Sequence, residues 1–166
     1  MKNLILITFS LLAINSITFG QKGVIKGQLI DYKTSKPIAG KTIILFGTTS
    51  GVTSDKEGRF EFDNLKLKNT ELIIYGGHIH DSGIGNKKNY YTLSLRNIKL
   101  NENNRTIDLK IIYLLDSDQN VSNLNFPCII LDEKTFQYKF VGGADRHFEG
   151  KFGLIDFSTP SKNCAL

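Results

Sequence analysis

The chain has 166 residues, of which 40% are hydrophobic and 22% are charged, with 15 glycines, 3 prolines and no tryptophan. This length suits one ordinary domain, or a small domain with an appendage, and is too short for a multidomain enzyme. The hydrophobic content argues against a disordered chain. No collagen-like segment, low-complexity run or internal repeat occurs in the sequence.

The first 20 residues have the pattern of a secretory signal peptide. Lys2 supplies a positive charge, residues 4–14 (LILITFSLLAI) are uncharged and apolar, and Thr18 and Gly20 are small residues before a cleavage point. The alternative is an N-terminal membrane anchor, but the run is shorter than the roughly 20 apolar residues of a spanning helix. We therefore expect cleavage before Gln21 and export to the periplasm or beyond, with no transmembrane segment in the mature chain.

Charge argues against a nucleic-acid partner. The net charge is +5 and falls to +4 once Lys2 leaves with the signal peptide. The basic residues are scattered in small groups, such as Lys87 with Lys88, whereas nucleic-acid binding calls for a concentrated basic face with interleaved aromatic residues. We interpret these lysines as solvated.

Strand patterns dominate the chain after residue 20, and helical periodicity is almost absent. Alternation of apolar and polar residues predicts strands in four segments, namely residues 60–63, 91–96, 106–111 and 136–140. In the third segment it places Ile107, Leu109 and Ile111 on one face. Residues 43–46 and 72–75 are apolar on both faces, which predicts strands in the middle of a sheet. Short strands separated by glycine-, proline- and asparagine-rich turns favour an antiparallel sandwich or barrel.

A polar, asparagine-rich stretch at residues 116–125 (DSDQNVSNLN) is the weakest seam in the mature chain. We divide the chain there, into a principal sandwich at residues 21–115 and an extension at residues 116–166. The extension is too short to bury a core of its own, so we expect it to add strands to the sandwich.

Residues 23–65 resemble the carboxypeptidase regulatory-like family, which has a transthyretin-like (prealbumin-like) β-sandwich. The resemblance rests on Gly27 and Asp31, on the run 36–40 (KPIAG), on the strand 42–46, and on the run 54–60 (SDKEGRF). Residues 72–76 then look like the next strand of the family, although Gly77 stands where an aromatic residue is usual. Residues 91–111 look more loosely like its closing strands.

The resemblance implies an all-β, antiparallel, Greek-key-type sandwich with extra C-terminal strands. The residues of its turn motif have structural roles: Pro37, Gly40, Asp55 and Gly58 shape turns, and Phe60 enters the space between the sheets. Similar proteins carry the module beside peptidases or transport receptors, as an accessory or interaction unit. The motif identifies a fold and no catalytic role.

Three histidines suggest an alternative function. His78 and His80 lie in a glycine-rich loop after a strand and would share one side if the strand continued, as two ligands of zinc or copper require. His147 could complete such a site if the fold brings it close. The competing interpretation is an ordinary polar loop.

The two cysteines, Cys128 and Cys164, are a disulfide candidate in an oxidising compartment. The alternative is that Cys128, inside an apolar run, is a buried thiol. The spacing along the chain does not decide between the two.

Other chemical motifs are weak. Residues 116–120 begin like a calcium loop, but Val121 and Pro127 occupy positions that need Gly and Glu, so a solvated linker is the better interpretation. No nucleophile motif is present, and we expect no cofactor. We therefore expect an exported, non-catalytic β-sandwich that binds a protein or glycan of the bacterial cell envelope. A small metal-binding protein is the alternative.

Overall fold

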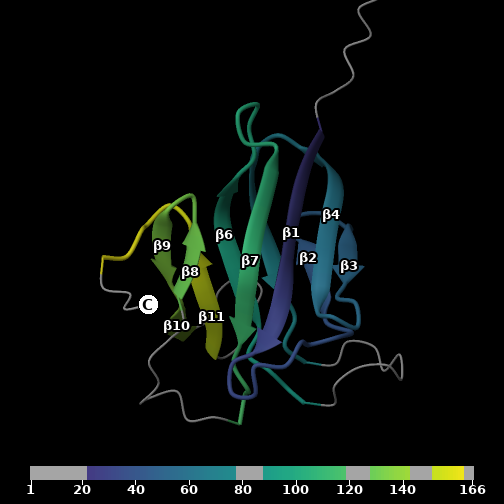
Figure 1. Cartoon of the computed structure of the whole chain (residues 1–166), viewed down its shortest axis with the longest axis vertical. Helices are drawn as coiled ribbons and strands as arrows, with labels where there is room; N and C mark the ends of the chain where they lie inside the picture. Colours follow the sequence, from purple (N-terminus) through teal and green to yellow (C-terminus); the bar gives the residue numbers. More distant parts are fainter. Residues whose placement is uncertain (1–21, 78–87, 119–127, 143–150, 163–166) are drawn as a thin grey trace, which may run out of the picture.

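The computed structural model describes residues 22–77, 88–118, 128–142 and 151–162, and within them the secondary structure is all β (Figure 1). The strands are β1 (Lys22–Asp31), β2 (Thr42–Leu45), β3 (Gly51–Thr53), β4 (Arg59–Lys66), β5 (Asn69–Ile74), β6 (Leu93–Lys99), β7 (Thr106–Leu114), β8 (Cys128–Leu131), β9 (Lys134–Gln137), β10 (Lys139–Gly142) and β11 (Lys151–Asp156). The described residues include no helix that is long and apolar enough to cross a membrane.

The strands form two packed layers. A small sheet has the order β4-β1-β7, and a large sheet has the order β10-β11-β6-β5-β2-β3. The hairpin β8-β9 lies beside β7 and widens the layer of the small sheet (Figure 1). This arrangement confirms the predicted sandwich. Parallel pairing of β1 with β7 and of β11 with β6 makes both sheets mixed.

Alternation along the strands builds the core between the layers. In β4, Phe60 and Phe62 are buried while Glu61 and Asp63 are exposed, as the sequence pattern predicts. The two runs that are apolar on both faces form β2 and β5, which both lie inside the large sheet. Each of them is paired with a strand on both edges, as their predicted place in the middle of a sheet requires.

The residues after Asp116 add strands to both layers. β11 pairs with β6, β10 pairs with β11, and the hairpin β8-β9 contributes Ile129 and Phe136 to the shared core. Aromatic contacts join this part to the rest: the ring centroids of Tyr91 and Phe140 lie 4.7 Å apart. The boundary at residue 115 stays a prediction, because strand pairing does not show whether residues 21–115 fold alone.

Three strands contain a β-bulge, and each bulge has a non-glycine residue with positive φ. The residues are Asn64 in β4 (φ 56°), Asn97 in β6 (φ 62°) and Lys110 in β7 (φ 55°). Next to each of them the strand pairing shifts register by one residue. A bulge inserts one unpaired residue, which reverses the inside–outside alternation beyond it.

The bulge at Lys110 overturns one prediction. Strict alternation places Ile111 on the buried face with Ile107 and Leu109. In the structure Ile107 and Leu109 are buried, but Ile111 is 42% exposed, and Ile112 takes the buried position instead. The extra residue in β7 between the partners of Lys26 and Gln28 causes this reversal.

Candidate binding surface

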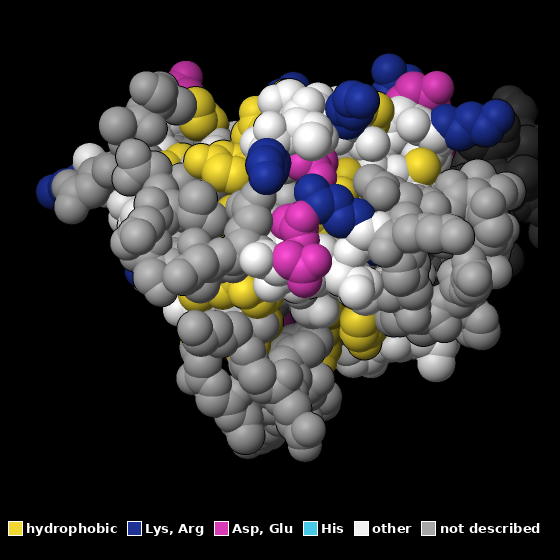
Figure 2. Space-filling view, turned by 90° about the horizontal axis from the view of Figure 1, so that it is seen from below, with side chains coloured by type: hydrophobic (Ala, Val, Ile, Leu, Met, Phe, Trp, Pro, Cys, Tyr) yellow, Lys and Arg dark blue, Asp and Glu magenta, His cyan; other side chains and the backbone are white. Residues whose placement is uncertain are grey.

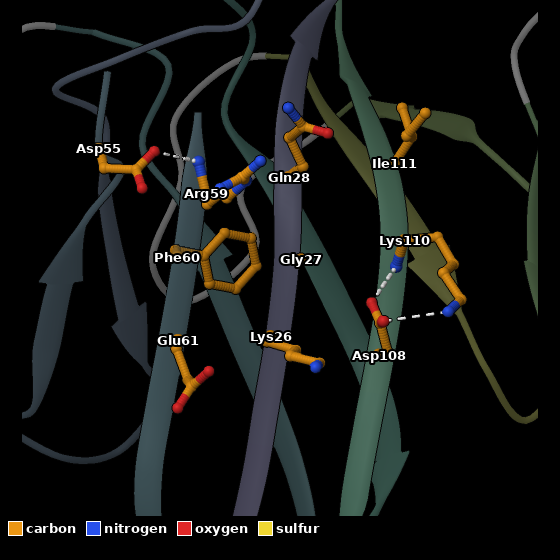
Figure 3. A pocket seen from close by; sticks show the side chains of 10 residues that line it. All are labelled: Lys26, Gly27, Gln28, Asp55, Arg59, Phe60, Glu61, Asp108, Lys110 and Ile111. Carbon is orange, nitrogen blue, oxygen red and sulfur yellow. Dashed lines mark hydrogen bonds and ion pairs between the residues drawn. The ribbon is translucent and has the colours of Figure 1, made fainter. Parts of the chain in front are cut away.

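The outer face of the small sheet carries a shallow hollow of about 690 Å³ that spans β4, β1 and β7 (Figure 3). We call it the small-sheet hollow. It is lined by Lys26, Gly27, Gln28, Asp55, Arg59, Phe60, Glu61, Asp108, Lys110 and Ile111.

One row of side chains across the hollow alternates in charge. Lys26 on β1 has Glu61 of β4 on one side and Asp108 of β7 on the other. Neighbouring strands lie about 4.8 Å apart, so the ammonium group stands between two carboxylates. None of the ion pairs among the described residues includes Lys26 or Glu61. Because Asp108 also pairs with Lys110, the charges of Lys26 and Glu61 balance each other in this row.

A second row offers three different kinds of group. Gln28 on β1 lies between Arg59 of β4 and Ile111 of β7. The side-chain amide of Gln28 donates a 2.7 Å hydrogen bond to the backbone carbonyl of Glu57, which holds it against the neighbouring turn. The row thus presents a cation, a fixed amide and an exposed aliphatic side chain.

Asp108 holds the bulge that turns Ile111 outward. One oxygen of its carboxylate accepts a hydrogen bond from the backbone N–H of Lys110 at 3.0 Å, and the other pairs with Lys110 Nζ at 3.0 Å (Figure 3). Burial by itself raises the pKa of Asp108, but these two hydrogen bonds, together with the charges of Lys110 and Lys26, outweigh burial and the pKa is lowered. The same carboxylate therefore stabilises a backbone conformation that a lysine rarely adopts.

A tight turn fixes the other side of the hollow. The carboxylate of Asp55 accepts a 2.7 Å hydrogen bond from the backbone N–H of Arg59, and the N–H of Asp55 donates to the carbonyl of Arg59 at 2.9 Å. Gly58 has a φ of +74°, and a Cβ there would overlap the carbonyl oxygen of Leu29. The turn therefore sets the point at which the side chain of Arg59 enters the hollow.

Gly27 and Phe60 lie beneath the hollow and face the core. Gly27 is paired with Phe60 across the strands, and a Cβ at position 27 would lie 3.1 Å from the ring of Phe60. The ring occupies this space and is only 4% exposed. The hollow consequently has no exposed aromatic surface among its lining residues.

A second group of charged residues gathers at the end of the sandwich where β1 and β7 finish. We call Asp31, Lys41, Lys88, Tyr90 and Asp116 the end cluster. Figure 2 views the molecule from this end and shows acidic and basic side chains side by side at its centre. Lys88 Nζ lies 3.0 Å from a carboxylate oxygen of Asp31 and 2.8 Å from one of Asp116.

Asp31 is the most heavily bonded member of the end cluster. Its carboxylate accepts hydrogen bonds from the backbone N–H groups of Lys33 and Thr34 and from the hydroxyl of Tyr90, besides the ion pair with Lys88. Burial by itself raises the pKa of Asp31, but the hydrogen bonds from Lys88, Thr34 and Tyr90 outweigh it and lower the pKa to about 2.

Lys41 links the end cluster to the backbone near Gly76 and near Lys88, where two segments lie close together. Its side chain is almost fully buried, and Nζ donates to the carbonyls of Gly76 at 2.7 Å and Lys88 at 3.2 Å while lying 5.0 Å from the ring centre of Tyr90. Burial lowers the pKa of Lys41, because it disfavours the ammonium form. The N–H of Tyr90 also donates to the carbonyl of Gly76.

The end cluster corrects two predictions. Lys88 is not a solvated lysine, because it forms two ion pairs and 28% of its side chain is exposed. Asp116 is not part of a solvated linker either, since its side chain is 14% exposed and pairs with Lys88. Both residues belong to an interaction between segments far apart in the sequence, which local patterns do not reveal.

The predicted metal ligands His78, His80 and His147 lie outside the described residues, so a metal site there stays a prediction. Within the described ranges, no group of three or more His, Cys, Asp or Glu side chains could hold a metal ion. Cys128 is disulfide-bonded. Cys164 lies outside the described residues, so the pairing of these two cysteines also stays a prediction.

The remaining residues of the turn motif lie away from the hollow. Pro37 pairs with Ile30 in an isolated bridge, and Gly40 has a φ of +73° before β2 begins. They shape the connection that leads from β1 in the small sheet to β2 in the large sheet. Of the motif, Asp55 and Phe60 line the hollow themselves, and Gly58 lies in the turn that borders it.

Sequence reasoning missed Lys26, Lys110 and Ile111 as members of a site. The alternating pattern of β7 gives no sign of a bulge. The only local signal is Asp108, whose carboxylate can accept a hydrogen bond from the backbone N–H of Lys110 two residues later. The small-sheet hollow offers charged, amide and aliphatic groups for contact with a ligand.

The chain belongs to the CarboxypepD_reg-like domain family, whose model matches residues 25–111, slightly more than half of the chain. The matched range covers the small sheet as far as Ile111 and therefore all the residues that line the hollow. No protein in a search of curated sequences matches the chain.

Several solved structures are similar to parts of the chain. The major pilin subunit BcpA of Bacillus cereus has 20% identity and a TM-score of 0.45, over 58% of this chain and 31% of the pilin. A type II cohesin–X-dockerin complex from Acetivibrio cellulolyticus has 19% identity and a TM-score of 0.42, over 61% and 63%. A 9R-lipoxygenase from Cyanothece PCC8801 has 23% identity and a TM-score of 0.37, over 66% and 19%. The chain thus spans less than two thirds of each of these proteins.

Proposed function

We propose that this chain is an exported, non-catalytic β-sandwich that acts as an accessory or interaction module of the cell envelope. It binds its partner through the small-sheet hollow. The observation that carries the proposal is the outward position of Ile111 on β7, which is 42% exposed at one side of a hollow lined by charged side chains.

The backbone around Ile111 supports this proposal. A left-handed conformation costs an L-residue about 1–2 kcal/mol, and Lys110 adopts it with a φ of 55°. Beyond the bulge Ile112 and Leu114 are buried in place of Ile111, so the shift in alternation leaves an apolar side chain in solvent. Contact with a partner would remove its surface from water and offset that cost.

Export is supported by the signal-peptide pattern of residues 1–20 and by the two cysteines of the chain. The test is the intact mass and N-terminal sequence of the protein recovered from the cells that make it. We expect the mature chain to begin at Gln21 and to be found outside the cytoplasm. An intact N-terminus at Met1 would contradict export.

Site-specific photo-crosslinking tests the binding face. A photoreactive amino acid replaces Ile111 in one variant and Ile130 in another, and both are irradiated in intact cells. Ile130 is a matched control, because it is an isoleucine of β8 with 44% exposure that does not line the hollow. We expect position 111 alone to give a defined adduct, identified by mass spectrometry as an envelope component.

Two results would contradict the proposed function. Position 111 could give no adduct, or positions 111 and 130 could give the same set of adducts at equal yield. In either case the small-sheet hollow has no specific partner in the cell. A variant of Ile111→Asp keeps the fold intact at this exposed position and should abolish capture of the partner by the purified protein.

A further inference from the structure

The charged side chains of the small-sheet hollow differ in how far their charges are already balanced. Lys110 is paired with Asp108, and Lys26 stands between the carboxylates of Glu61 and Asp108. Arg59 differs from them. Its neighbour across the strands is the neutral Gln28, and Asp55 bonds the backbone N–H of Arg59.

The guanidinium of Arg59 is therefore the unbalanced cation of the hollow. Among the ion pairs of the described residues none includes Arg59, and the residue is exposed. Figure 3 shows its side chain reaching from β4 toward Gln28, in the direction of β7. Ile111 lies at the other end of the same row. A cation and an aliphatic side chain thus face the same ligand space, less than three strand widths apart.

We infer that the hollow binds an extended segment of a partner protein that presents a carboxylate and an aliphatic side chain on one face. In an extended segment, residues i and i+2 share a face and lie about 6.6 Å apart. This spacing fits a row in which the long side chain of Arg59 reaches inward from β4. The inference rests on the proposed function and names the chemistry of its partner.

The neighbouring row restricts the partner further. Lys26 faces Glu61, and Lys110 pairs with Asp108, so a second carboxylate or a run of phosphates on the ligand would find no uncompensated cation in this row. A glycan would gain little, because the lining residues offer no exposed aromatic ring for a sugar to stack on. A single acid beside an apolar residue on a protein strand meets both conditions.

Synthetic peptides test this chemistry with the purified mature chain. They have threonine at every second position, which favours an extended conformation. One peptide carries Asp and Ile two residues apart, a second carries Asn in place of Asp, and a third carries Ser in place of Ile. Binding is followed by amide chemical-shift changes in the protein. We expect the first peptide to shift residues around Arg59 and Ile111, and each altered peptide to bind at least about fivefold more weakly.

Two variants identify the group that meets the carboxylate. Arg59→Gln should make the Asp and Asn peptides bind equally, whereas Lys66→Gln should leave the preference for Asp unchanged. Lys66 is a matched control, because it is an exposed cation of the same strand that does not line the hollow. Raising the salt concentration should weaken binding of the Asp peptide and have little effect on binding of the Asn peptide.

Three outcomes would overturn the inference. The peptides could shift residues elsewhere, the preference for Asp could survive Arg59→Gln, or sedimentation could show a dimer that Arg59→Gln dissociates, which would make a second copy of the chain the occupant. If crosslinking from position 111 still yields an envelope partner at the same level in the Arg59→Gln variant, the proposed function stands and only the inferred chemistry fails. Loss of the adduct in every variant, Lys66→Gln included, would instead remove the proposed function.

Discussion

The small-sheet hollow and the end cluster contain similar side chains in opposite states. In the end cluster, Asp31 and Asp116 share Lys88, and the ammonium group of Lys41 lies between carbonyl oxygens and an aromatic ring. In the hollow, Arg59 and Glu61 belong to none of the ion pairs among the described residues. A charge that leaves water must be compensated, whereas an exposed charge can remain available. Burial therefore separates the charges that hold this fold from those that can meet a partner.

The two regions also differ in the role of the backbone. At the end cluster, the chain near Gly76 and the chain near Tyr90 approach so closely that only glycine fits. At the hollow, the positive φ of Lys110 belongs to a bulge that buries Ile112 and moves Ile111 into solvent. The first feature excludes any side chain, and the second holds a lysine in a conformation that glycine adopts more easily. Variants in both regions should show this difference in size and in sign.

The largest effect is expected from Gly76→Ala. A Cβ at position 76 would overlap the backbone carbonyl of Tyr90, a residue held in place by the bond of its N–H to Gly76 and of its hydroxyl to Asp31. We expect a loss of about 4 kcal/mol or more in the free energy of unfolding. Gly77→Ala is the matched control, since a Cβ there meets nothing within 4 Å. Urea unfolding measures both, and equal stability of the two variants would contradict the close approach.

The next effect concerns Asp31→Asn at the end cluster and Asp108→Asn at the hollow. The side chain of Asp31 is 4% exposed, so removing its charge leaves Lys88 with only the less buried Asp116 as an ion-pair partner and should cost about 3 kcal/mol. The pair of Asp108 with Lys110 is exposed, with side-chain exposures of 36% and 71%, and should contribute less than about 1 kcal/mol. Chemical denaturation measures the free energy of unfolding of both variants. A larger loss of stability for Asp108→Asn than for Asp31→Asn would contradict the comparison.

Acid should remove more stability from the end cluster than from the hollow. Hydrogen bonds overcome the effect of burial and lower the pKa of Asp31 from 3.8 to about 2. A depressed carboxyl pKa stabilises the fold above the unfolded value, and this contribution, about 2 kcal/mol, is lost as the pH falls from 3.8 toward 2. The stability difference between wild type and Asp31→Asn should therefore shrink over this range. A constant difference from about pH 5 to about pH 2 would show that Asp31 does not titrate in this way.

The sequence predicts the layers of this fold well, because alternation in β4 and the apolar runs of β2 and β5 depend on neighbours close along the chain. It does not predict the end cluster, since Asp31 and Lys88 are 57 residues apart and meet only through the pairing of β1 with β7 and the packing of the two layers. The sequence does not predict the hollow either, for a different reason. A bulge changes the face of Ile111 without changing the residue types around it, so the same sequence pattern fits either face.

The smallest effect, and the one most specific to the hollow, is expected from Lys110→Gly. Glycine adopts a positive φ without the steric cost that a lysine bears, and this gain exceeds the loss of an exposed ion pair. We expect the free energy of unfolding to rise by up to about 1 kcal/mol. Lys26→Gly, on the adjacent strand with no positive φ, should instead destabilise the sheet by about 1 kcal/mol. If both variants lose stability equally, the bulge holds no backbone strain, and the exposure of Ile111 needs no partner to offset it.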